Sequence, residues 1–480
     1  MRDIGYSLET AIADIIDNSI SAGARNIDIR LDALSDDPAL AIIDDGGSMT
    51  PDELIAAMRS GSRSPRDERP TDDLGRFGLG MKTASFSQCR CLTVICRRDG
   101  VTHAARWDLD FVADANDWLV QVPPASAIEE LPFIGRLGEE GTMVLWQKLD
   151  RLAEEADANL RKDHVYRRMD EVRLHLELTF HRFLEGNRAF PKVAMEINRT
   201  PLKPFDPFNV QHPATQRLRE ETIRLANGRI RIQPYILPHN SKLPVREWEK
   251  YGGELGYARS QGFYLYRAGR LIIHSTWFRL AKQSELTKLA RVQIDMPNGM
   301  DHDWKVDVKK ASAQPPIAVR ERLKSIIGGI TGESGKVFRG RGRRATSGPS
   351  ATLWGRRMSQ GRIHYEINRA HPLLESFVEQ LDETGQREFV SVLQAIERAI
   401  PADAIFSDMA SSPWDLARPA LAEEELISLV VLTARSIRNQ GGTAEALKAA
   451  LKDAEPWRSH WAKAEAVIDR VFSGEFDEAA

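Results

Sequence analysis

Apolar residues recur at helical spacing near the start of the chain, between residues 6 and 24. On a helix of about 3.6 residues per turn they form one stripe, and a row of polar residues lies on the opposite face. The stripe is Leu8, Ala11, Ile12, Ile15, Ile16 and Ile20, and the row is Asp14, Asp17, Asn18 and Ser21. A solvated face is the usual explanation of such a row. The other explanation is a helix whose polar side faces a ligand.

Further along the chain, the pattern predicts two layered regions of strands and helices. The first has strand-like segments at residues 26–31, 41–43, 91–97, 103–109 and 142–148, and a long helical pattern at 162–184. The second has strand-like segments at residues 193–197, 229–237, 263–273 and 290–296, closed by a helix at 316–327. Strands followed by helices are typical of α/β layers. The last part, after a strand-like I-H-Y-E-I-N, is mainly helical at residues 374–400, at 423–438 and around Trp457, Trp461, Val467 and Val471.

The composition is that of a globular protein with several domains. The 480 residues favour about two to four domains, and 42% are hydrophobic while 28% are charged. The formal net charge is only −3, so contact with nucleic acid would require local basic patches. The sequence has no apolar run long enough to span a bilayer and no secretory signal. We therefore expect a cytoplasmic protein without a membrane partner.

The cysteines lie in and beside one strand-like segment. Cys89, Cys91 and Cys96, with His103, could be read as a zinc set. However, alternation along one strand cannot bring all four side chains to one tetrahedral point. Free cysteine is among the most buried residue types, so we expect buried reduced thiols.

Three later segments carry glycines beside polar residues. In residues 42–49, I-I-D-D-G-G-S-M, a strand runs into a glycine turn, which leaves an acidic side chain at the strand end and lets a flat ligand approach the backbone. In residues 75–85, G-R-F-G-L-G-M-K-T-A-S, glycines lead into a helix and offer backbone N–H groups to phosphate oxygens. Residues 141–145, G-T-M-V-L, place a glycine and a hydroxyl at the start of a strand. A tight turn is the ordinary explanation of each segment alone.

Together with the first helix, and in this order, these segments resemble the nucleotide pocket of the GHKL ATPases. That superfamily includes gyrase, the Hsp-ninety chaperones, the mismatch-repair MutL proteins, the histidine kinases and the microrchidia (MORC) proteins. The runs I-I-D-N-S-I-S-A-G-A and G-R-F-G-L-G-M-K-T-A-S are most similar to those of MORC and mismatch-repair members. The resemblance implies a Bergerat-type α/β (α+β) sandwich that binds ATP and Mg2+.

The resemblance also implies a role for each matching residue. Asn18 would hold Mg2+ against the triphosphate, as suits a hard cation that takes oxygen ligands. Asp44 would accept a hydrogen bond from the adenine amino group, and Thr142 would support the same edge, often through water. Gly46 would permit close approach of the base, and Met49 would pack on its face. The phosphate-binding residues would be Gly75, Gly78, Leu79 and Gly80, followed by Lys82 at the head of the next helix.

Two positions depart from the family pattern. The family places a glutamate as general base four residues before the asparagine, and this chain has Asp14 there. Aspartate is one methylene shorter, so we expect it to polarise the attacking water with some loss of rate. Glu9 cannot replace it, because it points to a different helix face. Ser48 stands where the adenine motif usually has its second glycine, and a small residue is tolerable there.

Residues 54–74 include S-G-S-R-S-P-R-D-E-R-P-T-D-D, which is rich in Gly, Ser, Pro and charge. Such a segment does not pack stably by itself. Its place before the phosphate glycines predicts a mobile lid over the nucleotide, and a plain surface loop is the alternative.

The second region resembles the transducer domain of the MORC and MutL relatives. Residues 266–272, Y-R-A-G-R-L-I, are similar to its signature strand. These domains send a lysine to the γ-phosphate of ATP, and Lys309 and Lys310 stand where that lysine belongs. They would point to opposite sides of an extended segment, so both remain candidates, and a surface lysine is the alternative. A phospho-acceptor among His164, His175 and His181 is disfavoured, because a histidine kinase carries that helix before its ATP-binding domain.

A basic tract follows the second region, at residues 332–361. It carries Arg339, Arg341, Arg343, Arg344, Arg356 and Arg357, with no acidic residue after Glu333. A flexible Gly-Arg tract contacts phosphates without reading sequence. A solubilising linker is the alternative.

These observations predict four parts: an ATP-binding domain at residues 1–190, a transducer domain at 191–331, a basic linker at 332–362 and a mainly helical domain at 363–480. We expect a MORC-like ATPase that hydrolyses ATP slowly, forms a homodimer when ATP is bound and closes as a clamp on DNA without sequence preference. The alternatives are a chaperone-like clamp on a protein client and a regulatory ATP-binding switch with little or no hydrolysis. DNA repair, chromosome compaction and phage defence would all suit such a clamp.

Overall fold

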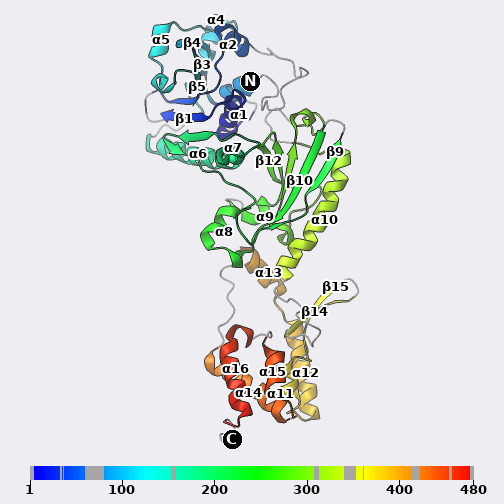
Figure 1. Cartoon of the computed structure of the whole chain (residues 1–480). Coiled ribbons are helices and arrows are strands. Elements are labelled where there is room, and N and C mark those ends of the chain that lie inside the picture. The colour runs from blue at the N-terminus through cyan, green and yellow to red at the C-terminus, as the bar shows by residue number, and fades with distance from the viewer. Residues whose placement is uncertain are drawn as a thin grey trace. The chain divides into compact units, whose positions relative to one another are not determined.

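The computed structural model describes residues 5–32, 35, 37–59, 80–152, 158–225, 228–253, 256–306, 313–339, 353–359, 362–411, 422–439, 441–452 and 457–475. The chain forms two compact units, Met1–Lys336 and Val337–Ala480 (Figure 1). Among the helices of the described residues, none is long and apolar enough to cross a membrane. The mixed α/β fold class predicted from the sequence is confirmed.

The first unit begins with a seven-stranded sheet in the order β4-β3-β5-β2-β1-β6-β7. Its strands are β1 (Asn26–Asp32), β2 (Ala39–Asp44), β3 (Cys91–Arg98), β4 (Val101–Asp108), β5 (Gly141–Gln147), β6 (Ala194–Ile197) and β7 (Thr200–Pro201). The first five confirm the predicted strands. β6 pairs in parallel with β1, so it extends this sheet, although the sequence analysis grouped it with the second region.

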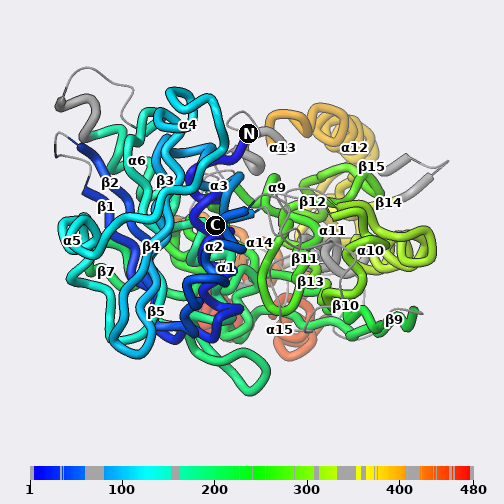
Figure 2. The backbone as a smooth tube through the Cα atoms, turned by 90° about the horizontal axis from the view of Figure 1, so that it is seen from above, coloured from blue at the N-terminus to red at the C-terminus, as the bar shows by residue number. Residues whose placement is uncertain are grey.

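Helices α1 (Leu8–Ser21), α3 (Gly80–Gln88) and α6 (Ala158–Thr179) contribute to one core cluster with a face of this sheet (Figure 2). The apolar stripe of α1 is buried in this core, as its spacing predicts. The other face is covered by α5 (Ala125–Glu129) and the turn η2 (Ile134–Arg136). Asp14 and Asp17 are also buried, so a solvated polar face is the wrong explanation for these two residues.

Short helices complete this domain. α2 (Pro51–Met58) starts at Thr50 with a capping box, in which Thr50 and Glu53 bond each other's backbone N–H groups. α4 (Leu109–Ala115) follows β4. The helix expected at residues 162–184 is α6 followed by α7 (His181–Glu185), interrupted at the fully buried Phe180.

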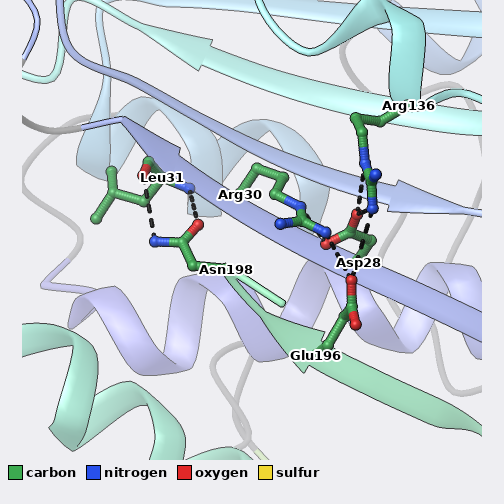
Figure 3. A network of polar contacts seen from close by, with 6 residues as sticks. All are labelled: Asp28, Arg30, Leu31, Arg136, Glu196 and Asn198. Atoms are coloured by element: carbon green, nitrogen blue, oxygen red, sulfur yellow. Dashed lines mark hydrogen bonds and ion pairs between the residues drawn. The ribbon is translucent and has the colours of Figure 1, made fainter. Parts of the chain in front are cut away.

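A polar network joins β6 to β1 and η2 (Figure 3). Arg30 pairs with Asp28 and with Glu196, both at 2.6 Å, and Arg136 reaches Asp28 at 3.0 Å. Asn198 accepts a hydrogen bond from the Leu31 N–H and donates one to the Leu31 carbonyl. These contacts hold the short strand β6 in register beside β1.

A second sheet has the order β12-β11-β13-β10-β8, with β9 paired to β10. Its strands are β8 (Gln216–Arg217), β9 (Glu221–Leu225), β10 (Gly228–Ile236), β11 (Gly262–Arg267), β12 (Arg270–Thr276) and β13 (Ala290–Met296). Helix α10 (Ile317–Arg339) runs alongside β9 and β10 and buries Val319, Leu323 and Ile330 (Figure 1). The short helices α8 (Val245–Gly252) and α9 (Gly256–Ser260) precede β11.

The single strand expected at residues 263–273 is a hairpin. Ala268 and Gly269 form its two-residue turn, and both have positive φ angles, 47° and 87°. Two such residues in succession are characteristic of the type I′ turn that joins antiparallel strands tightly. The prediction missed the turn because Ala-Gly is not one of the dipeptides that mark a turn strongly.

The second unit contains a hairpin of β14 (Trp354–Ser359) and β15 (Arg362–Ile367) and a set of helices. The helices are α11 (Pro372–Val378), α12 (Glu383–Arg398), α13 (Ala402–Ser411), α14 (Glu423–Asn439), α15 (Ala444–Leu451) and α16 (Trp461–Phe472). Trp457, Val467 and Val471 are buried in its core, which confirms the packed helical end.

The basic tract differs from the expected flexible linker. Its first part continues α10 to Arg339, and Arg356 and Arg357 lie on β14, where Arg357 pairs with Glu366. Arg341, Arg343 and Arg344 lie outside the described residues.

Candidate nucleotide-binding site

The other motif segments contact α1 at two places. The Ser19 hydroxyl on α1 donates to Asp44 Oδ2 at 2.6 Å, which ties the helix to the end of β2. Thr142 at the start of β5 pairs with Asp44 in the sheet register. At the start of α3, a Cβ added to Gly80 would lie 3.6 Å from Asp14 Oδ2. The fold therefore places Thr142 beside Asp44 and Gly80 beside Asp14, with α1 joining the two pairs.

Asp44 is held at the end of β2 by donors on both carboxylate oxygens. Its Oδ2 accepts from Ser19, and its Oδ1 accepts from the Gly46 N–H at 3.0 Å. Burial raises the pKa of this carboxyl, while the hydrogen bonds from Ser19 and from the Gly46 and Thr142 backbone act in the opposite direction. A fixed, buried carboxylate of this kind can accept a hydrogen bond from a ligand amino group without reorganisation.

Gly46 is required by the protein itself. A Cβ at this position would lie 3.1 Å from the Ala22 Cβ, the Ala22 carbonyl oxygen and Asp44 Oδ1. The neighbouring Gly47 N–H donates to the Ala22 carbonyl at 2.8 Å. The glycine turn is therefore clamped against the C-terminal end of α1, and this contact sets how α1 and Asp44 face each other.

Asp14 is engaged by residues that the sequence analysis did not select. The Tyr6 hydroxyl donates to Asp14 Oδ2 at 2.9 Å, and Arg270 Nη2 lies 3.7 Å from Asp14 Oδ1. Arg270 Nε also pairs with Asp17 Oδ1 at 2.8 Å. Burial and the Asp14 charge raise the pKa of Tyr6, so its hydroxyl stays protonated and donates.

The prediction missed Tyr6, Ser19 and Arg270. Their contacts with Asp14 and Asp44 depend on how the chain folds and cannot be read from neighbouring positions. The signals available were weak: Ser19 adjoins Asn18, Tyr6 precedes the helix, and Arg270 lies inside the Y-R-A-G-R-L-I run. Only the fold turns these neighbours toward Asp44 and Asp14.

Asn18 and Met49 lie where a ligand can reach them. Asn18 is exposed on α1, although the residues on either side of it are buried. Met49 is half-buried, and its carbonyl accepts a hydrogen bond from His103 Nε2 at 2.8 Å. An exposed amide beside buried carboxylates fits the donor set of a magnesium nucleotide, since Mg2+ takes oxygen ligands and keeps several waters.

Lys82 lies on α3, and its ammonium group is directed to α2. Its Nζ donates to the Ala57 carbonyl at 2.9 Å and to the Arg59 carbonyl. Burial lowers the pKa of this lysine. In this structure, Lys82 joins the first residues of α3 to the C-terminal end of α2.

Several predicted site residues lie outside the described part of the chain. These are Gly75, Gly78 and Leu79, and Lys309 and Lys310. Of the predicted lid at residues 54–74, residues 60–74 also lie outside the described part, whereas residues 54–58 belong to helix α2. Trp304 precedes the lysine segment and Gln314 follows it. The Gln314 N–H donates a hydrogen bond to the Trp304 carbonyl at 2.7 Å.

His175 on α6 and His181 on α7 are shielded from water. Burial lowers the pKa of His175 to about 4 and that of His181 to about 3. The His181 Nε2 lies 2.8 Å from the Tyr266 hydroxyl, across the junction with the second sheet. The three cysteines, Cys89, Cys91 and Cys96, are free and buried, as predicted.

Comparison with known proteins gives independent support to the ATP-binding part. Residues 6–139 match the family model described as "Histidine kinase-, DNA gyrase B-, and HSP90-like ATPase". The chain is 30% identical to the ATPase morc-1 of Caenorhabditis elegans over 95 residues, which is 20% of this chain and 11% of the relative. It is 33% identical to the DNA mismatch repair protein MutL of Paramagnetospirillum magneticum over 104 residues, which is 21% of this chain and 16% of the relative.

The chain therefore spans only a small part of these two relatives. Among solved structures, one described as the N-terminal domain of a DNA repair protein superposes with a TM-score of 0.41 and 14% identity. That superposition covers 68% of this chain and 95% of the other, and the similarity is too low to define a common fold.

Proposed function

We propose that the protein binds ATP with Mg2+ and hydrolyses it slowly, because residues 6–139 match the family model of the GHKL ATPases. The observation that carries this proposal is the way α1 joins two motif pairs: Ser19 holds Asp44, which lies beside Thr142, and Asp14 lies beside Gly80. Asp44 and Thr142 would receive the adenine edge, with Gly46 and Met49 beside it. Asn18 would hold Mg2+, which neutralises charge on the phosphates when it is bound.

Asp14 is the proposed general base. Its carboxylate would accept a proton from the attacking water while the bond between the γ-phosphorus and the bridging oxygen breaks, which releases ADP and phosphate. A positioned base contributes about 10²–10⁴ in rate, and the short aspartate side chain makes the lower end of that range the expectation. We further propose that Gly75, Gly78 and Leu79 assist phosphate binding, with Lys82 holding the adjoining start of α3 to α2, and that Lys309 or Lys310 reaches the γ-phosphate.

The experiment that tests this proposal is ATP hydrolysis by the purified protein with Mg2+, compared with Asp14→Asn and repeated with duplex DNA. Turnover that is lost in Asp14→Asn supports Asp14 as the base. If Asp14→Asn hydrolyses ATP at the wild-type rate, the general base is another group. ATP affinity measured in parallel separates loss of chemistry from loss of binding.

We propose that ATP binding drives dimerisation and that the dimer closes on DNA without reading its sequence. One relative is named as a DNA mismatch repair protein, which makes DNA the first partner to test. Decisive closure requires ATP to bind the closed state more tightly than the open state by several kcal/mol. The test is sedimentation of the protein with and without a non-hydrolysable ATP analogue, in which a concentration-dependent dimer must form only with nucleotide.

The β9–β10 hairpin offers a contact surface for the DNA backbone. Arg224 and Arg229 stand directly opposite each other across this strand pair, and both are exposed. Like charges in this position destabilise a sheet, and a bound phosphate relieves the repulsion. Arg231 lies two residues along the same strand. A cavity of about 300 Å³ beside it is lined by Thr222, Arg229, Arg231, Asp295, Met296 and Pro297.

This surface is tested with Arg224→Gln/Arg229→Gln and a matched control, Arg387→Gln/Arg398→Gln, which removes the same charge from exposed positions of α12. We expect the first pair to weaken DNA binding and to reduce the slope of log affinity against log salt by about 2, and the control to do neither. A third variant that neutralises the tract from Arg339 to Arg357 measures the contribution of that segment.

A regulatory ATP-binding switch that acts on a protein partner is the second candidate. It is favoured by one observation: the Asp14 carboxylate already accepts from Tyr6 and lies beside Arg270. ATP-dependent dimerisation without measurable turnover, and without retention on DNA, would favour this candidate over the DNA clamp.

A further inference from the structure

The tight turn between β11 and β12 carries a buried arginine on each side. Arg267 ends β11, Arg270 begins β12, and the two pair in the sheet register. Each is only 4% exposed. A type I′ turn has little freedom, because both of its central residues need positive φ. The two guanidinium groups are therefore carried by one rigid tip.

The two arginines are anchored in different places. Arg267 Nε lies 2.8 and 2.9 Å from the two carboxylate oxygens of Asp301, which follows β13 along the chain. Arg270 instead meets α1 of the ATP-binding domain. The hairpin tip is thus fixed to its own sheet on one side and to the ATP-binding helix on the other.

Close packing brings the turn to the ATP-binding domain. A Cβ added to Gly269 would come within 2.5 Å of the Phe190 ring, so only glycine permits this approach. Ala268 packs against the core cluster that includes α1. This docking delivers Arg270 to a place where the carboxylates of α1 have little access to water.

Arg270 makes two unequal contacts with α1. Its Nε lies 2.8 Å from Asp17 Oδ1, within the distance of an ion pair, whereas its Nη2 lies 3.7 Å from Asp14 Oδ1, longer than a hydrogen bond. The side chains of Asp14 and Asp17 are 4% and 1% exposed. Removing the cation from such a buried group is costly, because it leaves a buried charge uncompensated.

These contacts hold the Asp14 carboxylate from two sides. The Tyr6 hydroxyl donates to Oδ2 at 2.9 Å, and the Arg270 guanidinium lies beside Oδ1. The guanidinium fork has a fixed geometry, so its pair with Asp17 determines how close its second arm comes to Asp14.

We infer that Arg270 is a positioning residue for ATP hydrolysis: anchored on Asp17, it orients the Asp14 carboxylate, so that the position of the transducer hairpin controls the general base. This inference rests on the proposed function, in which Asp14 activates the attacking water. It adds that hydrolysis depends on the contact between the second sheet and α1. A shift of the hairpin by about 1 Å would change the rate by as much as 10²-fold, because proton transfer depends steeply on geometry.

The test compares Arg270→Lys with Arg267→Lys. Both variants keep the positive charge and lose a buried guanidinium from the same turn, at the same exposure. A lysine provides one point charge and cannot hold two carboxylates at fixed angles. We expect Arg270→Lys to lower kcat by on the order of 10²-fold and to leave the affinity for a non-hydrolysable ATP analogue near that of the wild type. Arg267→Lys should lower thermal stability without a comparable fall in kcat.

A second variant protects the test against a folding defect. In Arg270→Ala, guanidinium ion at a low, non-denaturing concentration should restore part of the lost turnover, whereas it should do nothing for Arg267→Ala. A purely structural arginine would give equal losses of stability and kcat in the two lysine variants and no rescue.

The outcomes separate this inference from the proposed function. If the wild-type protein hydrolyses ATP and Arg270→Lys keeps the wild-type kcat, the role of Arg270 is overturned and the proposed function stands. The same conclusion follows if Arg270→Lys and Arg267→Lys lose equal amounts of kcat and stability. Wild-type protein that binds ATP without turning it over would overturn the proposed hydrolysis and this role with it.

Discussion

At the scale of single residues, the site depends on carboxylates whose surroundings differ. Asp44 accepts hydrogen bonds from Ser19 and Gly46, whereas Asp14 contacts Tyr6 and lies near a guanidinium. Under the proposed function, the donors around Asp44 would hold it as a receptor for a ligand amino group, and the neighbours of Asp14 would fix its orientation. The same residue type would then serve recognition in one place and proton transfer in the other.

The first prediction concerns the pH dependence of ATP affinity. Burial raises the pKa of Asp44, so its carboxyl takes up a proton at a higher pH than an exposed aspartate would. The protonated form is the weaker acceptor for the adenine amino group. ATP affinity should therefore fall as the pH is lowered from about 7 toward about 4, which calorimetric titration at several pH values can measure.

Asp44→Asn is the control for this prediction. The amide does not titrate, so its weaker affinity should keep only the pH dependence that comes from the phosphates of ATP, whose second pKa is about 6, and should vary less than that of the wild type. Wild-type affinity with the same pH dependence as the variant would show that Asp44 does not receive the base.

At the scale of elements, the pairing of β2 with β5 leaves no room for a side chain at Gly141, the first residue of β5. This residue has φ of 140°, and an added Cβ would lie 2.0 Å from the Asp44 carbonyl oxygen. We expect Gly141→Ala to lower the free energy of unfolding by about 3 kcal/mol, through strain and steric overlap together, and to weaken ATP binding by displacing Asp44. Urea unfolding measures the first effect and nucleotide titration the second.

Gly100→Ala is the matched control. Gly100 also has positive φ, 77°, in the turn between β3 and β4, but an added Cβ would meet nothing within 4 Å. We expect it to cost about 1 kcal/mol and to leave ATP affinity unchanged. Equal costs for the two variants would mean that the contact with Asp44 is unimportant.

The link between α2 and α3 leads to a third prediction. Lys82→Met removes the donor to the carbonyls of Ala57 and Arg59 and should lower the free energy of unfolding by about 1–3 kcal/mol, because these hydrogen bonds come from a charged group. Lys148→Met, which removes a half-exposed lysine paired with Asp108 and Asp110, should cost at most about 1 kcal/mol. A large loss of ATP affinity in Lys82→Met with unchanged stability would instead place this ammonium on the phosphates.

At the scale of the whole molecule, the ATP-binding domain and the second sheet are joined by side-chain contacts as well as by the chain. Arg182 pairs with Asp295 and lies 3.6 Å from the centre of the Tyr266 ring. His181 reaches the Tyr266 hydroxyl, and Arg270 reaches α1. Such a junction can transmit the nucleotide state if two arrangements of it differ in their affinity for ATP.

The fourth prediction addresses Lys309 and Lys310. If either lysine contacts the γ-phosphate only in the closed state, the double alanine variant should retain initial ATP binding and lose ATP-dependent dimerisation. Nucleotide titration and sedimentation with saturating analogue measure the two steps. A variant that loses ATP affinity but dimerises normally would contradict the proposed role.

The sequence by itself determined the local features of this protein. The spacing of apolar residues places α1, the strands of the first sheet and the packed helical end, because helix and strand periods are short-range properties. The motif segments identify the ATP-binding domain, since the chemistry of a purine and its phosphates requires particular residues at particular places in a local turn. Short strands such as β8 and β14 were missed, because two to six residues carry too little pattern without their partners.

Only the tertiary structure decided which groups surround the reacting atoms. Asp14 and Asp17 are buried rather than solvated because β12 brings Arg270 to them, and Lys82 bonds α2 because α3 packs beside it. These contacts join residues far apart in the chain, so no local window contains both partners. Their free energy depends on desolvation, which exists only once the core has closed around them.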